Sequence, residues 1–300
     1  MDMTQNKCCR HGANLRRRRR RRRKILRSII FSCSIIAVAV FVAVGSSMIR
    51  SGDGRTNKND VEAGNNTYDN AVIENSKISE KNKIQNNQSM LDDIMNSTQY
   101  PKQLKDLALK NEEALEFVYD YPAEHVKEHT IDLTEEASMD SVPLFVQWDK
   151  RWGYEKYSGN FFAASGCGPT TLSMVVVYLT HNREASPIAV AKYSKEAGYS
   201  VDGSGSSWTL ISEGCRHYGV KAKAVALDES RMKAELDAGH PIVINVGPGD
   251  FTDTGHFMVI TGYDDEGFSI NDPNSIEKSG KRWLFKNISS QIRAVWSMYV

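Results

Sequence analysis

The feature that most constrains the fold is a glycine turn that leads directly into an apolar run. The turn is Ser165-Gly166-Cys167-Gly168-Pro169-Thr170-Thr171, and residues 172–179 that follow it are mostly Val, Leu and Met. Proline is well tolerated in the first turn of a helix, and glycine permits a sharp bend before it. A helix that is apolar on nearly all sides belongs in a core. The sequence therefore predicts a buried helix that begins near Cys167.

Cys167 would stand at the amino end of this helix. The helix dipole and the unpaired N–H groups there favour a thiolate. Cysteines in such positions have pKa values lowered to about 3.5–7.5 from about 8.5. Two interpretations stay open on this stretch alone: a nucleophilic cysteine, or a structural cysteine beside a glycine turn.

The net charge of +1 conceals a strong asymmetry at the amino end. Residues 1–27 carry twelve Lys and Arg against one Asp, a charge of +11, so the rest of the chain carries −10. Residues 28–49 carry no charge, and a run of about 20 apolar residues is enough to span a bilayer. Because a basic block before a span stays in the cytoplasm, we predict a cytoplasmic tail (1–27), a transmembrane signal anchor (28–49) and an extracellular remainder. This makes the chain a single-pass protein of the cell membrane.

The sequence leaves two alternatives to an uncleaved anchor. Ala43-Val44-Gly45 offers small residues for signal-peptide cleavage, although the apolar run exceeds the usual length of about 7–15 residues. Arginine blocks also occur in nucleic-acid-binding segments. Directly before a membrane span, however, the block indicates membrane association, and no nucleic-acid partner is expected.

The cysteines divide according to this topology. Of the five, only Cys167 and Cys215 fall in the predicted extracellular part, so that part is not a disulfide scaffold. A single Cys167–Cys215 bridge stays open as an alternative, and it would exclude a nucleophilic role for Cys167. Because Cys215 falls on an apolar helical face, we expect it to be buried and both thiols to be free.

Composition divides the remainder into three parts. Residues 50–99 are rich in Asn, Ser, Asp and Lys, and such a segment buries too little apolar surface to order itself, so a disordered tether is predicted. Residues 100–140 hold an amphipathic helix, expected to pack on the next domain, and a polar connector from residue 123. Residues 141–300 are numerous enough for one substantial core.

Within residues 141–300, helical patterns come first and strand patterns later, which favours an α+β fold with a largely antiparallel sheet. After the helix at Cys167, helices are predicted at 187–198, 207–218 and 228–239, and strands at 241–246, 257–263, 268–271, 281–286 and 293–300. The glycine–serine loop 201–206 lacks the Gly-Lys-Ser/Thr of a phosphate-binding loop.

Three further residues complete a possible catalytic set with Cys167. His256 precedes a predicted strand, and Asp272 ends the next one, so a hairpin can return Asp272 beside His256. A thiolate, a base and an orienting carboxylate are the parts that nucleophilic catalysis requires. Gln147 is a candidate oxyanion donor alongside the backbone N–H of Cys167. The alternatives are a histidine that only caps a strand and a solvated glutamine. The other histidines show no metal-ligand spacing, so neither a metal nor a cofactor is expected.

Four motifs in this order resemble the double-glycine-leader peptidase-like family, papain-fold relatives of the bacteriocin-processing cysteine peptidases. The motifs are VPLFVQWDKRW from Val142, SGCGPT from Ser165, GHFMVITGY from Gly255 and NDPN from Asn271. The resemblance covers roughly residues 141–300 and implies a papain-like cysteine peptidase fold. It also implies Cys167 as nucleophile, His256 as base, Asp272 as orienting group and Gln147 in the oxyanion hole.

The function expected from the sequence is a membrane-anchored extracellular cysteine peptidase that acts on a peptide or protein substrate. One alternative is an amidase or endopeptidase of the same fold that acts on peptidoglycan. Another is an inactive papain-like domain used for binding at the cell surface, although a complete triad weighs against it. Family members fused to transporters act in the cytoplasm, whereas the predicted topology is external. Cleavage of double-glycine leaders is therefore left open.

Overall fold

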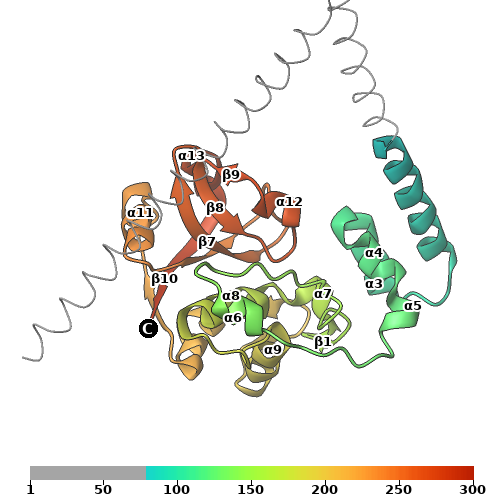
Figure 1. The fold of residues 1–300 in the computed structure, drawn as a ribbon, viewed down its shortest axis with the longest axis horizontal. Helices are drawn as coiled ribbons and strands as arrows, with labels where there is room; N and C mark the ends of the chain where they lie inside the picture. The colour runs from blue at the N-terminus through green and yellow to red at the C-terminus, as the bar shows by residue number, and fades with distance from the viewer. Residues whose placement is uncertain (1–78) are drawn as a thin grey trace, which may run out of the picture. The chain divides into compact units, whose positions relative to one another are not determined.

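The computed structural model describes residues 79–300 and shows an α+β protein. Its main sheet is antiparallel throughout, with the strand order β5-β10-β6-β7-β8-β9 (Figure 1). The strands of this sheet are β5 (Lys221–Ala224), β6 (Ile242–Val246), β7 (His256–Asp264), β8 (Gly267–Asn271), β9 (Arg282–Trp283) and β10 (Ile292–Tyr299). Two small hairpins are formed by β1 (Lys156–Tyr157) with β2 (Asn160–Phe161) and by β3 (Ser200–Val201) with β4 (Gly205–Ser206).

The helices lie before the sheet in the chain and between its strands. They are the helix 79–96, α3 (Lys102–Lys110), α4 (Leu115–Tyr119), α5 (Tyr121–Glu124), α6 (Thr134–Ser138), α7 (Phe162–Ser165), α8 (Cys167–Thr180), α9 (Pro187–Glu196), α10 (Thr209–Ser212), α11 (Glu229–Asp237), α12 (Ile276–Ser279) and α13 (Phe285–Ile288). Short 3-10 turns are η1 (Glu112–Ala114), η2 (Gly214–Tyr218) and η3 (Ser289–Gln291).

The sheet is buried on both faces. Val243 and Val259 belong to one cluster of buried side chains, and Ile244 and Met258 to a second. Successive residues of a strand point to opposite faces, so the two clusters lie on opposite sides of the sheet. Every residue of β6 is buried, because helices cover both sides of this central strand.

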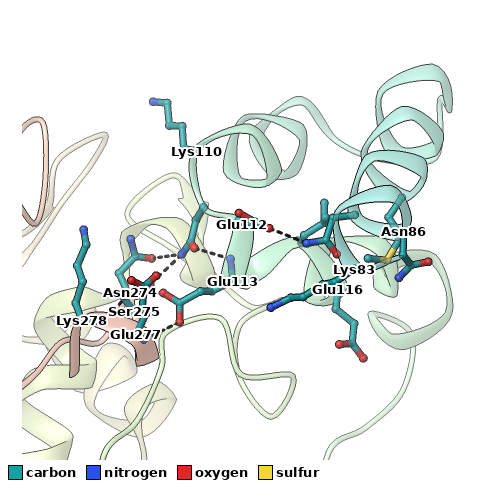
Figure 2. Close-up of a pocket in the computed structure, with 14 residues that line it drawn as sticks. Lys83, Asn86, Lys110, Glu112, Glu113, Glu116, Asn274, Ser275, Glu277 and Lys278 are labelled. Carbon is teal, nitrogen blue, oxygen red and sulfur yellow. Dashed lines mark hydrogen bonds between the residues drawn. The ribbon is translucent and has the colours of Figure 1, made fainter. Parts of the chain in front are cut away.

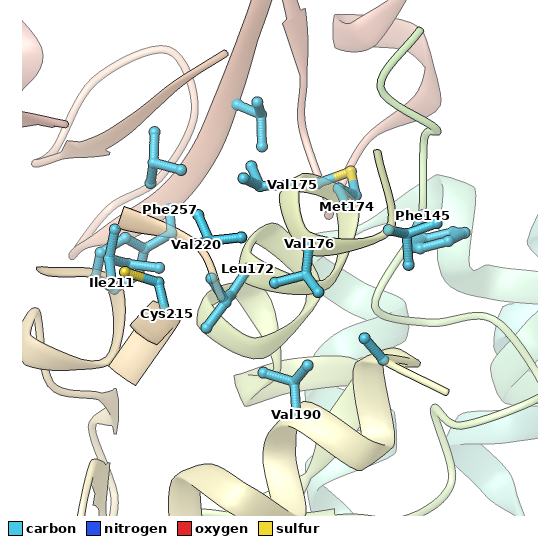
Figure 3. Close-up of a cluster of buried hydrophobic side chains, with 14 of the residues drawn as sticks. Phe145, Leu172, Met174, Val175, Val176, Val190, Ile211, Cys215, Val220 and Phe257 are labelled. Atoms are coloured by element: carbon cyan, nitrogen blue, oxygen red, sulfur yellow. The ribbon is translucent and has the colours of Figure 1, made fainter. Parts of the chain in front are cut away.

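Helix α8 covers the first face, with α9 packed against it (Figure 1). Leu172, Met174, Val175 and Val176 of α8 are fully buried in the first cluster (Figure 3). Helices α11 and α13 contribute to the second cluster on the opposite face. The predicted start of α8 at Cys167, its buried position and the α+β class with a largely antiparallel sheet are thereby confirmed.

Two predicted elements inside the domain are wrong in part. The predicted helix 207–218 is broken at Glu213 into α10 and η2, and η2 begins at Gly214, where a side chain would lie 3.0 Å from the ring of Tyr199. The predicted strand 281–286 is reduced to the two residues of β9, after which the chain turns into α13. Strand β5 was not predicted. It is a largely exposed Lys-Ala-Lys-Ala edge strand that forms through its pairing with β10.

The predicted disordered tether 50–99 is corrected for the part that the structure describes, since residues 79–96 form a helix. Met90, Leu91 and Ile94 lie three to four residues apart or adjacent, on one helical face. They pack in a third apolar cluster with side chains of α3 and α4, and Ile94 is fully buried there. The Asn, Ser, Asp and Lys residues that suggested disorder lie mainly on the exposed face of this helix.

The predicted helix in residues 100–140 is divided into α3, η1, α4 and α5. The third cluster also contains Phe161 and Ala163, and the ring of Phe117 stacks on Tyr154 at 4.2 Å between centroids. The predicted connector holds α6, whose Ala137 is part of the α8 core. Residues 79–140 thus pack against residues 141–300 within one compact unit, as expected for the predicted amphipathic helix.

The predicted tail 1–27, the predicted anchor 28–49 and the tether up to residue 78 lie outside the described residues. Within residues 79–300, no helix combines the length and apolar character needed to cross a membrane.

Candidate active site

Cys167 is the first residue of α8, directly after the short helix α7. A side chain at Gly166 would come within 2.6 Å of the ring of Phe162, and one at Gly168 within 2.5 Å of Ser206 Oγ. The two glycines therefore allow α7 and the β4 hairpin to pack tightly around the start of α8. Cys167 itself is half-buried at the amino end of α8.

His256 is the first residue of β7, where it pairs with Val246 of β6, and it is 6% exposed. One turn along α8 from the cysteine, Thr171 Oγ1 donates a hydrogen bond to the carbonyl oxygen of Phe257 at 3.0 Å, and both groups are buried. This bond joins the helix that carries Cys167 to the strand that carries His256.

Asp272 follows β8 and is 1% exposed. The β7–β8 hairpin brings it back beside His256, as the sequence predicts, and His256 Nε2 lies 2.7 Å from Asp272 Oδ1. Because Nε2 is directed at the carboxylate, Nδ1 is the ring nitrogen left for the thiol.

The charges of these groups depend on one another. Burial by itself raises the pKa of the Cys167 thiol, but the hydrogen bond and positive charge of His256, with backbone hydrogen bonds at Phe257 and Gly168, outweigh it and lower the pKa. Burial by itself lowers the pKa of His256, but the charge and hydrogen bond of Asp272, together with Cys167, raise it to about 10. The site therefore favours a thiolate beside an imidazolium.

Gln147 is buried between the segment that precedes Cys167 and the turn that follows Asp272. Its Nε2 donates to the carbonyl oxygen of Ala163 at 2.7 Å and lies 3.3 Å from Asn274 Oδ1. Its backbone N–H donates to Pro273 O at 2.7 Å. Its Oε1 has no partner among residues 79–300. For Gln147 to donate to an oxyanion, the longer bond to Asn274 has to be exchanged.

Asn274 is a site residue that the sequence did not reveal. Its backbone N–H donates to Asp272 Oδ1 at 2.8 Å, and its side-chain oxygen faces Gln147. Its carbonyl oxygen accepts from Trp148 Nε1 at 3.2 Å. Asp side chains commonly accept from the N–H two residues later in turns, and Asp-Pro-Asn carries this signal. Within the described part of the chain Asp272 Oδ2 has no partner, so His256 and Asn274 alone hold the carboxylate.

The remaining candidates take no part in this arrangement. Cys215 is buried in the core (Figure 3), where burial raises its pKa to about 11. Cys167 and Cys215 are both free, so the alternative of a bridge between them is not present. No cluster of three or more His, Cys, Asp or Glu suited to a metal occurs between residues 79 and 300.

A match to a protein-family model agrees with the motifs. The model of the Peptidase_C39 like family matches residues 139–300. The peptidase domain of Streptococcus ComA, a bi-functional ABC transporter involved in a quorum-sensing pathway, is 19% identical, with 45% of this chain and 90% of that chain covered and a TM-score of 0.37. A protein designated a C39-like peptidase from Bacillus anthracis is 18% identical, with 53% of this chain and 95% of that chain covered and a TM-score of 0.33. No curated protein matches the chain.

Proposed function

The chain belongs to the Peptidase_C39 like family, and we propose that it is a papain-like cysteine peptidase with Cys167 as its nucleophile. The observation that carries the proposal is the pairing of a half-buried thiol of lowered pKa with a buried imidazole of raised pKa. Asp272, at 2.7 Å from His256 Nε2, supports the imidazolium. A structural cysteine in a core has the opposite property, as Cys215 shows with its raised pKa.

The proposed reaction begins with attack of the Cys167 thiolate on the carbonyl carbon of a peptide bond. The backbone N–H of Cys167 and, after exchange of its bond to Asn274, Gln147 Nε2 stabilise the oxyanion. His256 Nδ1–H then protonates the leaving amine as the C–N bond breaks and a thioester remains. Neutral His256 next accepts a proton from water, whose oxygen attacks the thioester and releases the acid and the thiolate. Asp272 keeps the imidazole oriented throughout.

The proposed setting of this activity is the outer face of the cell membrane. It is supported by the arginine-rich residues 1–27 and the uncharged residues 28–49. The substrate class is a peptide or protein, including the peptides of a cell wall.

Turnover by the full chain tests the proposal. Wild type, Cys167→Ala and Cys215→Ala are compared on unfolded protein and on purified peptidoglycan, with new amino groups as the readout. We expect wild type and Cys215→Ala to cleave and Cys167→Ala to be inactive. Cleavage by Cys167→Ala would contradict the proposal. Cleavage of peptidoglycan alone would favour the wall-directed alternative, and no cleavage of either by a folded wild type would favour the binding module.

A further inference from the structure

We propose that Asn111 and Glu113 are positioning residues for the turn 272–275, which carries the triad carboxylate. Both residues precede the family-matched residues 139–300. The inference rests on the proposed function, because it concerns the geometry of that same site. Under this proposal, a segment that precedes the family-matched residues helps to position the catalytic groups.

Asn111 holds Asn274 through two hydrogen bonds from one amide. Its Nδ2 donates to Asn274 O at 2.9 Å and to Asn274 Oδ1 at 3.1 Å. Its own Oδ1 accepts from the backbone N–H of Glu113 at 3.0 Å, which caps η1. The amide is therefore fixed at both ends, and its two N–H groups point at the turn.

Glu113 binds the three residues that follow Asn274. Its carboxylate accepts from the backbone N–H of Ile276 at 2.7 Å and from that of Glu277 at 3.1 Å. It also accepts from the hydroxyl of Ser275, which lies close to Glu113 in Figure 2. Hydrogen bonds to an ionised carboxylate are stronger than those between neutral groups. The start of α12 is thereby anchored to η1.

Asn274 connects these contacts to the proposed catalytic groups, because it bonds to both Asp272 and Gln147. Among residues 79–300, the Asp272 carboxylate accepts from two donors, His256 Nε2 and the backbone N–H of Asn274. A displacement of Asn274 therefore moves one of the two partners of the carboxylate. Asn274 Oδ1 is also shared between Asn111 Nδ2 and Gln147 Nε2, so Asn111 acts on the carboxylate and on the candidate oxyanion donor together.

The contact between residues 111–113 and the turn 272–275 is mainly polar. A cavity of about 650 Å³ lies beside it, lined by residues of 83–90, 110–116 and 274–278 (Figure 2). Most of the lining side chains are Asn, Glu and Lys, whereas the apolar contacts of the segment are made elsewhere, against Phe161 and Ala163. Asn111 and Glu113 therefore position the turn through directional hydrogen bonds.

The test measures the rate at which iodoacetamide alkylates Cys167 against pH, by mass spectrometry of the full 300-residue chain. Asn111→Asp keeps the acceptor that caps η1 but replaces the N–H donor with a carboxylate oxygen facing two oxygens of Asn274. The groups that interact with the thiol are His256 and, through it, Asp272, with Tyr157 nearby. We expect the midpoint of the alkylation profile to rise by about 1 pH unit, a tenfold change in the thiol equilibrium.

Two further variants make the result decisive. Glu113→Gln should shift the midpoint in the same direction by a smaller amount, and it decides the matter if Asn111→Asp does not fold. Asn87→Ala removes a hydrogen bond to Glu112 Oε1 of 2.7 Å in the same segment without touching the turn. It should keep the wild-type midpoint.

The positioning role would be overturned if folded Asn111→Asp and Glu113→Gln both kept the wild-type midpoint of Cys167 alkylation. It would also be overturned if Asn87→Ala shifted that midpoint as much as Asn111→Asp does. Those results leave the lowered wild-type midpoint, and with it the proposed function, intact. A wild-type midpoint in the ordinary thiol range would instead contradict the proposed function, and the positioning role would fall with it.

Discussion

At the scale of single residues, the electrostatics of the site depend on Asp272. Both Cys167 and His256 lose hydration at this position, and burial alone would keep each of them neutral. The Asp272 carboxylate stabilises the imidazolium, and the imidazolium in turn stabilises the thiolate. The ion pair therefore exists in the pH window between the pKa of Cys167 and the pKa of His256, and both pKa values depend on the Asp272 carboxylate.

Replacement of Asp272 by Asn should narrow that window from both sides. Without the negative charge, the raised pKa of His256 falls, so activity that needs the imidazolium is lost at a lower pH than in wild type. The lowered pKa of Cys167 rises, so activity on the acid side begins at a higher pH. We expect the maximal kcat/KM to fall about 100-fold, within the range for general acid–base groups. The pH profile of kcat/KM checks this.

Asp264→Asn is the matched control, because this carboxylate lies at the other end of the same hairpin and pairs with Arg282 at the surface at 2.8 Å. Its profile should match that of wild type. A profile of unchanged width in Asp272→Asn would contradict the electrostatic role of Asp272.

A second prediction concerns the close packing at the start of α8. In Gly168→Ala the new methyl group would meet Ser206, with 2.5 Å to its Oγ and 2.7 Å to its Cβ. Overpacking of this kind costs about 1–3 kcal/mol, and Ser206→Gly in the same chain should recover part of it. Gly262→Ala is the control, since nothing lies within 4 Å of the added atom. Denaturant unfolding measures the change, and equal stability of Gly168→Ala and wild type would refute the tight fit.

The residues of the site differ in how far the sequence reveals them. Cys167, His256 and Asp272 could be predicted as a set because each stands at the end of an element with a strong local pattern. Asn111 and Glu113 could not, since their contacts reach residues more than 160 positions away. Isolated Asn and Glu side chains carry no periodic signal that would indicate such a partner.

At the scale of elements, the site depends on how α8 and β7 are joined. The hydroxyl of Thr171 bonds to β7 one residue beyond His256. Thr171→Val preserves the shape of the side chain but removes this donor. We expect the free energy of unfolding to fall by about 1–2 kcal/mol and kcat to fall as the spacing between Cys167 and His256 loosens.

Thr180→Val is the control for Thr171→Val. It removes a hydroxyl from the same helix, but one that bonds within the helix, to Val176 O at 2.7 Å. It should leave kcat unchanged. Thermal unfolding and steady-state kinetics on both variants decide the matter, and an equal kcat for Thr171→Val and wild type would show that the bond does not position the site.

The elements themselves were predictable where one physical effect dominates. Helix α8 follows from an apolar run between a glycine turn and a polar stretch, and β6 to β8 follow from apolar strand patterns separated by turns. Strand β5 has no such pattern, since Lys-Ala-Lys-Ala becomes a strand only through the edge of the sheet that β10 offers. The break at Glu213 interrupts a stretch whose apolar spacing is helical, so the local pattern gives no sign of it.

At the scale of the whole molecule, the polar amino-terminal segment was the hardest part to interpret from composition. Its helix 79–96 is mostly exposed, and the few apolar residues that fix it are too sparse to stand out among Asn and Lys. The compact unit therefore begins well before the residues that the family model matches.

The proposed topology gives a prediction at this scale. Protease added to intact protoplasts should remove the carboxy-terminal domain while a tag at the amino terminus survives, because residues 51–300 are proposed to lie outside the cell. Lysed protoplasts provide the control, in which the tag is lost as well. Protection of the entire chain in intact protoplasts would contradict an external domain.

If Cys167 is the thiolate of a catalytic ion pair, the pH dependence of its alkylation must show a lowered pKa that His256 maintains. In wild type, Cys167 should be alkylated with a midpoint well below the ordinary thiol value of about 8.5. Cys215, whose pKa burial raises to about 11, should hardly react. His256→Ala should return the Cys167 midpoint to the ordinary range. A wild-type midpoint at or above that value, or one that His256→Ala leaves in place, would contradict the account.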